Sequence, residues 1–297
     1  MDNRIIDLHV HSTESDGTVT PKDLVYAARE AGLSAFALTD HDTVAGIAKA
    51  ADAAKAEGIE LIPGIELSTQ YTYTTGSSPA KEKEVHIVGL FIDPANPLLL
   101  EKTAEFRRCR DDRNILMVEA LQKEGFDITM DALMAENPDC VVTRANIARF
   151  LLNHGMIKNM QEAFDKYIGD GCRCYISRFK ITPMEAVELI HHAGGIAILA
   201  HPLLYHFNTT TLQQLIDELK AVGLDGIEAI YSTYTTGEEQ LVKKLAASNH
   251  LLISGGSDFH GNNKPSIRLG KGMGHLYIPY SVLDDLKKSI PTERTSR

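Results

Sequence analysis

Short apolar runs alternate with amphipathic segments along most of the chain. The apolar runs are rich in β-branched residues, and each is followed by a turn and then by apolar positions at helical spacing. This alternation is typical of βα units around a parallel sheet. We expect strands at 5–8, 35–38, 60–65, 85–92, 196–200, 226–231 and 251–254, and a further strand at 275–278. Seven or eight such units predict an α/β fold with a closed or nearly closed barrel.

Two of the predicted helices begin with the same residue types. Thr20 and Thr182 each stand at an N-cap, followed by Pro at the first helical position and by an acidic residue two positions later. Glycine then ends both helices. Further helices are expected at 44–57, 211–222 and 236–248.

The segment 98–174 departs from the alternation. Its helical stretches follow one another without strands between them, at 98–124, 130–136, 143–153 and 160–168. We therefore expect three parts: 1–97 as the first part of the barrel, 98–174 as an all-helical insertion, and 175–297 as the second part of the barrel. The Thr-, Ser- and Gly-rich stretch 71–84 predicts a mobile loop, and 291–297 a frayed tail.

Composition narrows the class of protein. The chain has 297 residues, 43% of them apolar, which is ample for a core. No apolar run approaches the ~20 residues that span a bilayer, and the first residues lack a secretory segment. We therefore expect a cytoplasmic protein that binds no membrane and needs no obligate protein partner. A formal net charge of −10 argues against a surface that coats duplex nucleic acid.

The first candidate site lies at the end of the first strand. Asp7, His9 and His11 alternate along an extended segment, so their side chains face the same side. This spacing suits a metal site, but a strand that runs out into solvent would also carry such residues. Asp16 follows within a Ser-Asp-Gly tripeptide, which on its own indicates a turn.

Similar polar residues close other strand-like runs. They are Asp40, His41 and Asp42 after the second run, Glu66 after the third, His201 after the fifth, and Asp258 and His260 after the seventh. The ends of successive strands form the face on which barrel enzymes place their sites. Asp42 is also expected to cap the helix that starts near Val44. His86 is the exception, because it stands at the start of its run.

These motifs, in this order, resemble those of the PHP (polymerase and histidinol phosphatase) superfamily of metal-dependent phosphoesterases. The resemblance covers about 1–93 and 180–270, and it implies a distorted seven-stranded (β/α) barrel that holds three divalent ions. Carried over to this chain, the metal ligands are His9, His11, Asp16, His41, Glu66, His86, His201, Asp258 and His260. Asp7 and Asp40 would support the site.

Within the superfamily, the sequence is most similar to stand-alone nucleotide phosphatases and 5′-exonucleases of short oligonucleotides. These proteins carry a helical insert in which an Arg-Pro-His-like motif helps to bind phosphate. Here the corresponding residues are Arg144 and, in place of His, Asn146. Arg178 and Lys180 fall where the family has further phosphate-contacting residues, although Lys180 equally suits an ordinary solvated charge.

A site of imidazole and carboxylate without thiolate suits manganese, iron or zinc, with magnesium also compatible. Our hypothesis is that two to three divalent ions bind, that a hydroxide held between two of them attacks phosphorus in line, and that Arg144 helps to neutralise the phosphoryl oxygens. A nucleotide or a short oligonucleotide is the expected substrate.

Four alternatives stay open at this point. A histidinol-phosphate phosphatase would use the same site. An amidohydrolase would use a similar barrel, usually with fewer metals and often with a carbamylated Lys, and the strand ends carry no Lys here. A non-catalytic, metal-stabilised scaffold and a sensor of phosphorylated ligands would bind without turnover.

Overall fold

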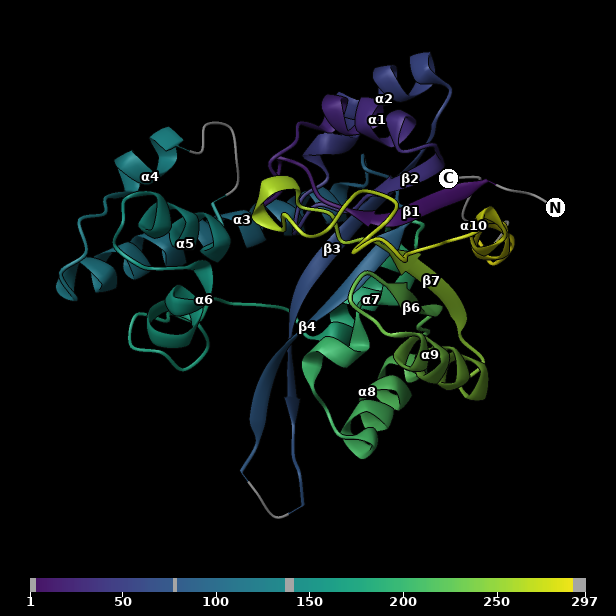
Figure 1. Ribbon diagram of the computed structural model, residues 1–297. Coiled ribbons are helices and arrows are strands. Elements are labelled where there is room, and N and C mark those ends of the chain that lie inside the picture. Colours follow the sequence, from purple (N-terminus) through teal and green to yellow (C-terminus); the bar gives the residue numbers. More distant parts are fainter. Residues whose placement is uncertain (1–3, 77–78, 137–141, 291–297) are drawn as a thin grey trace.

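Seven strands form one sheet in the order β1 to β7 (Figure 1). The computed structural model describes residues 4–76, 79–136 and 142–290. The strands are β1 (Ile5–Val10), β2 (Leu33–Leu38), β3 (Glu60–Tyr73), β4 (Lys81–Leu90), β5 (Ile196–Leu199), β6 (Gly226–Tyr231) and β7 (Leu252–Gly256). Just beyond β7, the Asp258 amide donates to the His9 carbonyl over 2.8 Å, and Phe259 bridges Val10. The sheet is therefore nearly closed into a barrel, which confirms the predicted fold class.

The direction of β4 differs from that of the other strands. β1, β2 and β3 run parallel, as do β5, β6 and β7, but β4 is antiparallel to both β3 and β5. The first half of β4, and not its end, therefore crosses the edge of the sheet where the other strands end. This edge is called the mouth of the barrel below.

Helices cover the outside of the barrel. They are α1 (Pro21–Glu30), α2 (Ala45–Glu57), α7 (Pro183–His192), α8 (Thr209–Ala221), α9 (Thr236–Ser248) and α10 (Tyr280–Lys288). The predicted caps are confirmed: Thr20 accepts a hydrogen bond from the Asp23 amide, and Thr182 forms a full capping box with Glu185. In the described part of the chain, no helix has the length and apolar character needed to cross a membrane.

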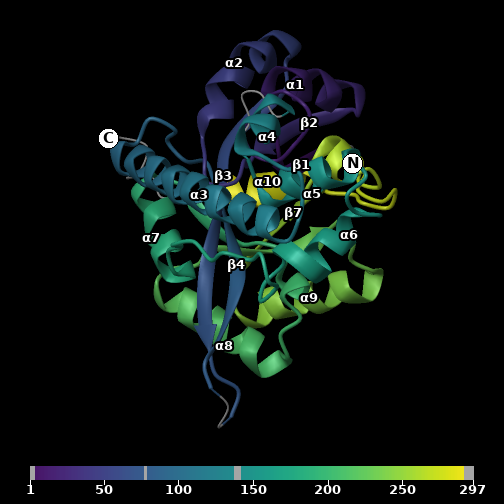
Figure 2. The same cartoon turned by 90° about the vertical axis from the view of Figure 1, so that its left-hand side faces the viewer.

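The prediction of a mobile loop at 71–84 is wrong for 71–73 and 81–84, which are strand residues, whereas 74–76 and 79–80 lie outside the strands. β3 and β4 continue as an antiparallel ribbon in which Tyr73 pairs with Lys81. Figures 1 and 2 show this arm pointing away from the barrel. Its Thr and Tyr residues favour extended backbone, and the cross-strand hydrogen bonds stabilise it. The predicted strand at 275–278 is also wrong, because this stretch makes only isolated bonds, such as the one that the Ile278 carbonyl accepts from the Ile6 amide at 3.0 Å.

The segment between β4 and β5 is helical, as expected. It contains α3 (Pro97–Lys123), α4 (Met130–Glu136), α5 (Arg144–Asn153), α6 (Met160–Ala163) and a π-helical turn (Phe164–Ile168). These elements bury a cluster of their own that includes Met117, Leu121 and Ile147. Because β4 is reversed, α3 starts at the edge opposite the mouth, where Asn96 donates to the His192 carbonyl. Its 27 residues span about 40 Å and carry the segment to the mouth.

Candidate metal centre and anion pocket

Glu66 lies at the centre of a buried group of histidines at the mouth of the barrel. Its Oε2 lies 3.2 Å from Nε2 of both His9 and His11 and 3.1 Å from Nδ1 of His41. Its Oε1 lies 2.9 Å from Nδ1 of His86 and 3.1 Å from Nε2 of His201. Although burial opposes ionisation, the imidazoles of His41, His9 and His86 hold the pKa of Glu66 well below its usual range.

The remaining predicted ligands adjoin this group. Asp258 Oδ1 lies 3.4 Å from His11 Nε2 and 3.2 Å from His260 Nδ1. Asp16 Oδ1 lies 3.1 Å from His260 Nε2. The structure thus brings all nine predicted metal ligands together, from segments spread over most of the chain.

Strand geometry explains two ligands that the sequence placed awkwardly. His86 stands at the start of the predicted run 85–92 but in the middle of β4, and the reversal of that strand brings it to the mouth. The sequence analysis placed Glu66 after the third strand. In the structure Glu66 lies within β3, because β3 continues past the mouth into the arm. Gly256 allows β7 to approach β1 here: a Cβ atom on it would lie 2.1 Å from the Cβ of His9.

Asp7 and Asp40 lie behind the ligands. Asp7 accepts hydrogen bonds from the amides of Ser257 and Gly270, both at 2.8 Å, and burial raises its pKa to about 6 despite these bonds. Asp40 accepts from the amide and hydroxyl of Ser12 at 2.7 and 2.6 Å, and thereby orders the loop that carries Asp16. Both carboxylates position the loops around the site.

Glu228 has a similar role that the sequence analysis missed. Its Oε1 lies 3.0 Å from His9 Nδ1, and its Oε2 accepts from the His201 amide at 2.8 Å. The bond to His9 leaves Nε2 of that ring facing Glu66. A buried Glu inside the otherwise apolar strand β6 was the available signal.

The donor atoms of this cluster fit divalent metal ions. Among the described residues, several buried ring nitrogens make no hydrogen bond of good geometry: His9 Nε2, His11 Nδ1 and Nε2, His41 Nδ1 and His201 Nδ1. Three of them crowd around one oxygen, Glu66 Oε2, at 3.1–3.2 Å. Burying such atoms without a partner is unfavourable, whereas imidazole nitrogen and carboxylate oxygen both coordinate divalent cations. Three overlapping groups have ligand atoms within 4.8 Å of one another: His11, Asp16, His41 and His260; His9, His11 and Glu66; and His41, Glu66 and His86.

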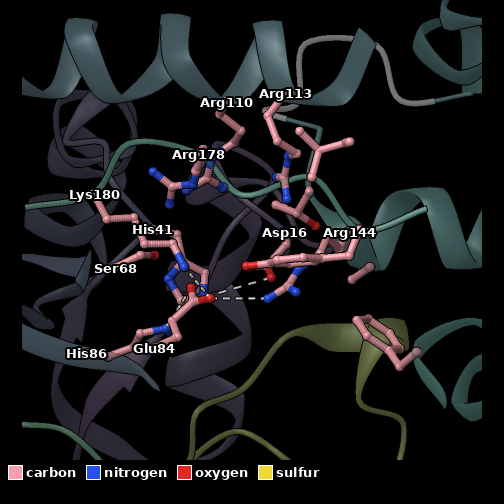
Figure 3. A pocket seen from close by; sticks show the side chains of 15 residues that line it. Asp16, His41, Ser68, Glu84, His86, Arg110, Arg113, Arg144, Arg178 and Lys180 are labelled. Carbon is pink, nitrogen blue, oxygen red and sulfur yellow. Dashed lines mark hydrogen bonds and ion pairs between the residues drawn. The ribbon is translucent and has the colours of Figure 1, made fainter. Parts of the chain in front are cut away.

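A cavity of about 180 Å³ adjoins the metal centre on the side of the helical segment. Besides Asp16, His41 and His86, it is lined by five cationic side chains, which are Arg110, Arg113, Arg144, Arg178 and Lys180 (Figure 3). We call this cavity the anion pocket. Predicted residues Arg144, Arg178 and Lys180 do line it, whereas Arg110 and Arg113 of α3 were missed.

Asp42 holds two of these cations in place. It forms ion pairs with Arg110 and with Arg178, the latter at 2.7 Å, and accepts from the Ser68 amide at 2.9 Å. Burial opposes its ionisation, but the two guanidinium groups lower its pKa to about 2. The prediction that Asp42 caps a helix is wrong, since Val44 occupies the N-cap of α2 and the first amide of that helix, Ala45, donates to the Thr43 hydroxyl at 3.2 Å.

The other cations differ in their partners. Glu84 Oε2 accepts from Lys180 Nζ at 2.6 Å and from Arg144 Nη2 at 3.1 Å, and Arg144 also pairs with Asp170 at 2.7 Å. Arg113 forms no ion pair or hydrogen bond with any described residue, and its Nε is buried. Burial and the neighbouring guanidinium groups lower its pKa to about 9. An unpartnered buried cation aimed into a pocket indicates an anionic ligand.

The structure does not bring Asn146 into the lining of the anion pocket. Its Oδ1 accepts from the Thr143 amide at 2.8 Å and from the Thr143 hydroxyl at 2.7 Å, which forms a capping box at the start of α5. This side chain is therefore engaged in ordering the turn that presents Arg144. Its predicted contact with substrate has no support in this geometry.

Comparison with known proteins agrees with the geometry of the site. The family model for the PHP domain matches residues 7–167. The chain belongs to the PHP domain family. This PHP protein is 39% identical over 254 residues to a 5′-3′ exoribonuclease of Haemophilus influenzae, covering 86% of this chain and 89% of the relative. It is 35% identical to a 3′,5′-nucleoside bisphosphate phosphatase of Chromobacterium violaceum, covering 91% and 90%.

A solved structure shares the whole fold. It comes from Bifidobacterium adolescentis, and its protein is provisionally described as a metal-dependent phosphoesterase. The TM-score is 0.80 at 29% identity, and the match covers 95% of each chain.

Proposed function

We propose that this protein is a metal-dependent phosphoesterase that hydrolyses phosphate esters of nucleotides, either nucleoside 3′,5′-bisphosphates or the 5′ ends of short oligonucleotides. The observation that carries the proposal is the contact between a buried His and carboxylate cluster and a pocket with five cationic side chains. One part suits divalent ions, and the other suits a phosphate. The names of the two relatives, an exoribonuclease and a bisphosphate phosphatase, support nucleotides as the substrate class.

The nine clustered ligands would hold two or three divalent ions, with manganese, iron or zinc favoured over magnesium. Such ions lower the pKa of bound water and neutralise charge on phosphoryl oxygens. The chain itself supplies orientation: Glu228 fixes the ring of His9, and Asp40 fixes the loop of Asp16. Arg113, Arg144 and Lys180 would bind a second phosphate of the substrate in the anion pocket.

The proposal assigns different tasks to the parts of the chain. The barrel, 1–97 with 175–297, would supply the metal ligands, and the helical insertion 98–174 would supply Arg113 and Arg144. The substrate is small, so neither a membrane nor an obligate protein partner is required. We propose that the protein works in the cytoplasm.

The experiment is a hydrolysis panel with metal-loaded protein. It compares nucleoside monophosphates, 3′,5′-bisphosphates, short oligonucleotides and histidinol phosphate. We expect His9→Ala and Asp258→Ala to abolish hydrolysis and to reduce the bound metal, as measured by elemental analysis. The matched control is His192→Ala, at an exposed position at the end of α7, which should keep both the hydrolysis and the bound metal of the wild type. Full hydrolysis by either site variant would contradict the proposal, and a preference for histidinol phosphate would redirect it.

A further inference from the structure

Glu84 is a carboxylate among the cations of the anion pocket, and its position is unexpected for a site that binds anions. We propose that Glu84 sets a charge threshold for the substrate: its carboxylate takes the place of a phosphate on Lys180 and Arg144, and a dianionic terminal phosphate displaces it while a monoanionic phosphodiester does not. This inference rests on the proposed function and adds a specificity-determining residue to it.

The contacts of Glu84 place it between the two halves of the site. Its Oε2 binds Lys180 Nζ at 2.6 Å and Arg144 Nη2 at 3.1 Å, and its Oε1 lies 3.4 Å from Nε2 of His86 (Figure 3). Glu84 precedes His86 by two positions on β4, so both side chains face the mouth. The carboxylate thus reaches from a metal ligand to the cations of the anion pocket.

The partners of this carboxylate are the partners that a phosphate needs. Phosphate is bound by charge-assisted bonds from Arg and Lys side chains, and a carboxylate accepts the same bonds. Among the residues that the structure describes, the Glu84 carboxylate contacts Lys180, Arg144 and His86, which all belong to the site. A rotation of the Glu84 side chain is therefore enough to free Lys180 and Arg144 for a phosphate.

Charge decides which ligand can make this exchange. Three carboxylates pair with the cations of the pocket. Asp42 is committed to Arg110 and Arg178, Glu84 binds Lys180 and Arg144, and Asp170 also binds Arg144. A monoanionic phosphodiester would replace one negative charge by another. A dianion adds a charge, and Arg113 lies in the pocket without an anionic partner to receive it.

The test is Glu84→Gln, which keeps the shape and removes the charge. The readout is the ratio of kcat/KM for a nucleoside bisphosphate to that for its monomethyl ester at the uncleaved phosphate. We expect the wild type to favour the dianion and the variant to lower this ratio at least about tenfold, because like-charge repulsion of the monoanion is lost. The matched control is Glu82→Gln, whose carboxylate binds Gln70 on the arm at 3.2 Å and does not line the pocket. An unchanged ratio in Glu84→Gln overturns the proposal.

Binding without turnover separates this inference from the proposed function. Calorimetry compares inorganic phosphate with dimethyl phosphate on the metal-loaded wild type and on Glu84→Gln, so a protein that hydrolyses no nucleotide still tests Glu84. We expect the ratio of the affinity for inorganic phosphate to that for dimethyl phosphate to fall in the variant. An equal ratio in both proteins overturns the proposed role of Glu84. A crystal structure of the wild type with inorganic phosphate needs no variant. The anion should lie on Lys180 and Arg144 with Glu84 turned away, and a phosphate bound while Glu84 keeps both contacts contradicts the exchange.

Discussion

Replacing Asp42 with Asn tests whether one carboxylate holds the walls of the anion pocket together. Asn keeps the size of the side chain and an oxygen for the Ser68 amide, but it leaves Arg110 and Arg178 without their shared counter-ion. All three side chains are at most 5% exposed, so water cannot replace the lost charge. Removing one member of a buried ion pair costs about 3–5 kcal/mol.

The lowered pKa of Asp42 leads to a similar magnitude. Its fall from 3.8 to about 2 corresponds to ~2.5 kcal/mol at about 1.36 kcal/mol per pKa unit. We therefore expect Asp42→Asn to lower the free energy of unfolding by about 3 kcal/mol. Because the folded-state pKa lies below the unfolded one, the contribution is present above about pH 4 and is lost as the pH falls towards 2. The gap between wild type and variant should close over that range.

Urea unfolding at neutral pH, followed by circular dichroism, measures the difference. The matched control is Asp217→Asn on the exposed face of α8, which should change the free energy by less than about 0.5 kcal/mol. A loss below about 1 kcal/mol for Asp42→Asn would refute the reasoning. A difference in the free energy of unfolding between the two proteins that does not change with pH would also refute it.

Three more variants or treatments probe other parts of the site. Asn146→Ala should lower the free energy of unfolding by about 1 kcal/mol through loss of the capping box, with unchanged calorimetric affinity for phosphate; weaker phosphate binding would instead restore Asn146 as a contact. Arg113→Met should weaken phosphate binding at least about tenfold. The Tm of this variant in phosphate-free buffer should equal or exceed that of the wild type, because a buried unpartnered cation is removed. If the variant bound phosphate as tightly as the wild type does, the assigned role of Arg113 would be wrong. Dialysis against a chelator should lower Tm and stop hydrolysis, and Mn²⁺ should restore both, since metal binds the folded state; a Tm that survives metal removal would argue against the metal centre.

The sequence predicted the ligands because each strand end carries its own short motif. His86 was the uncertain member, since an apolar run indicates a strand but not its direction. Only the reversal of β4 brings the start of that run to the mouth. The position of Glu66 inside a long strand could not be inferred either, because the third apolar run gives no sign that β3 continues past the mouth into the arm.

The cations of α3 were missed because charges on a long helix usually face solvent. Arg110 and Arg113 nevertheless share the buried face of α3 with Phe106 and Met117, at spacings of three and four residues. A charge on an apolar face was the available signal. Partners such as Glu84 and Lys180 could not be predicted, since they are 96 residues apart and meet only in the folded protein.

The ion pairs of Asp42 have a mechanical consequence for the helical segment. The chain leaves the barrel along α3, which carries Arg110, and returns through the stretch that carries Arg178. One carboxylate beside His41 therefore binds both crossings at the same place. The segment is also held elsewhere, because Arg144 pairs with Glu84 and Arg149 donates to the Asn262 carbonyl at 2.7 Å. We therefore expect loss of the Asp42 charge to loosen both ends of the segment together, while these outer contacts keep α5 at the mouth.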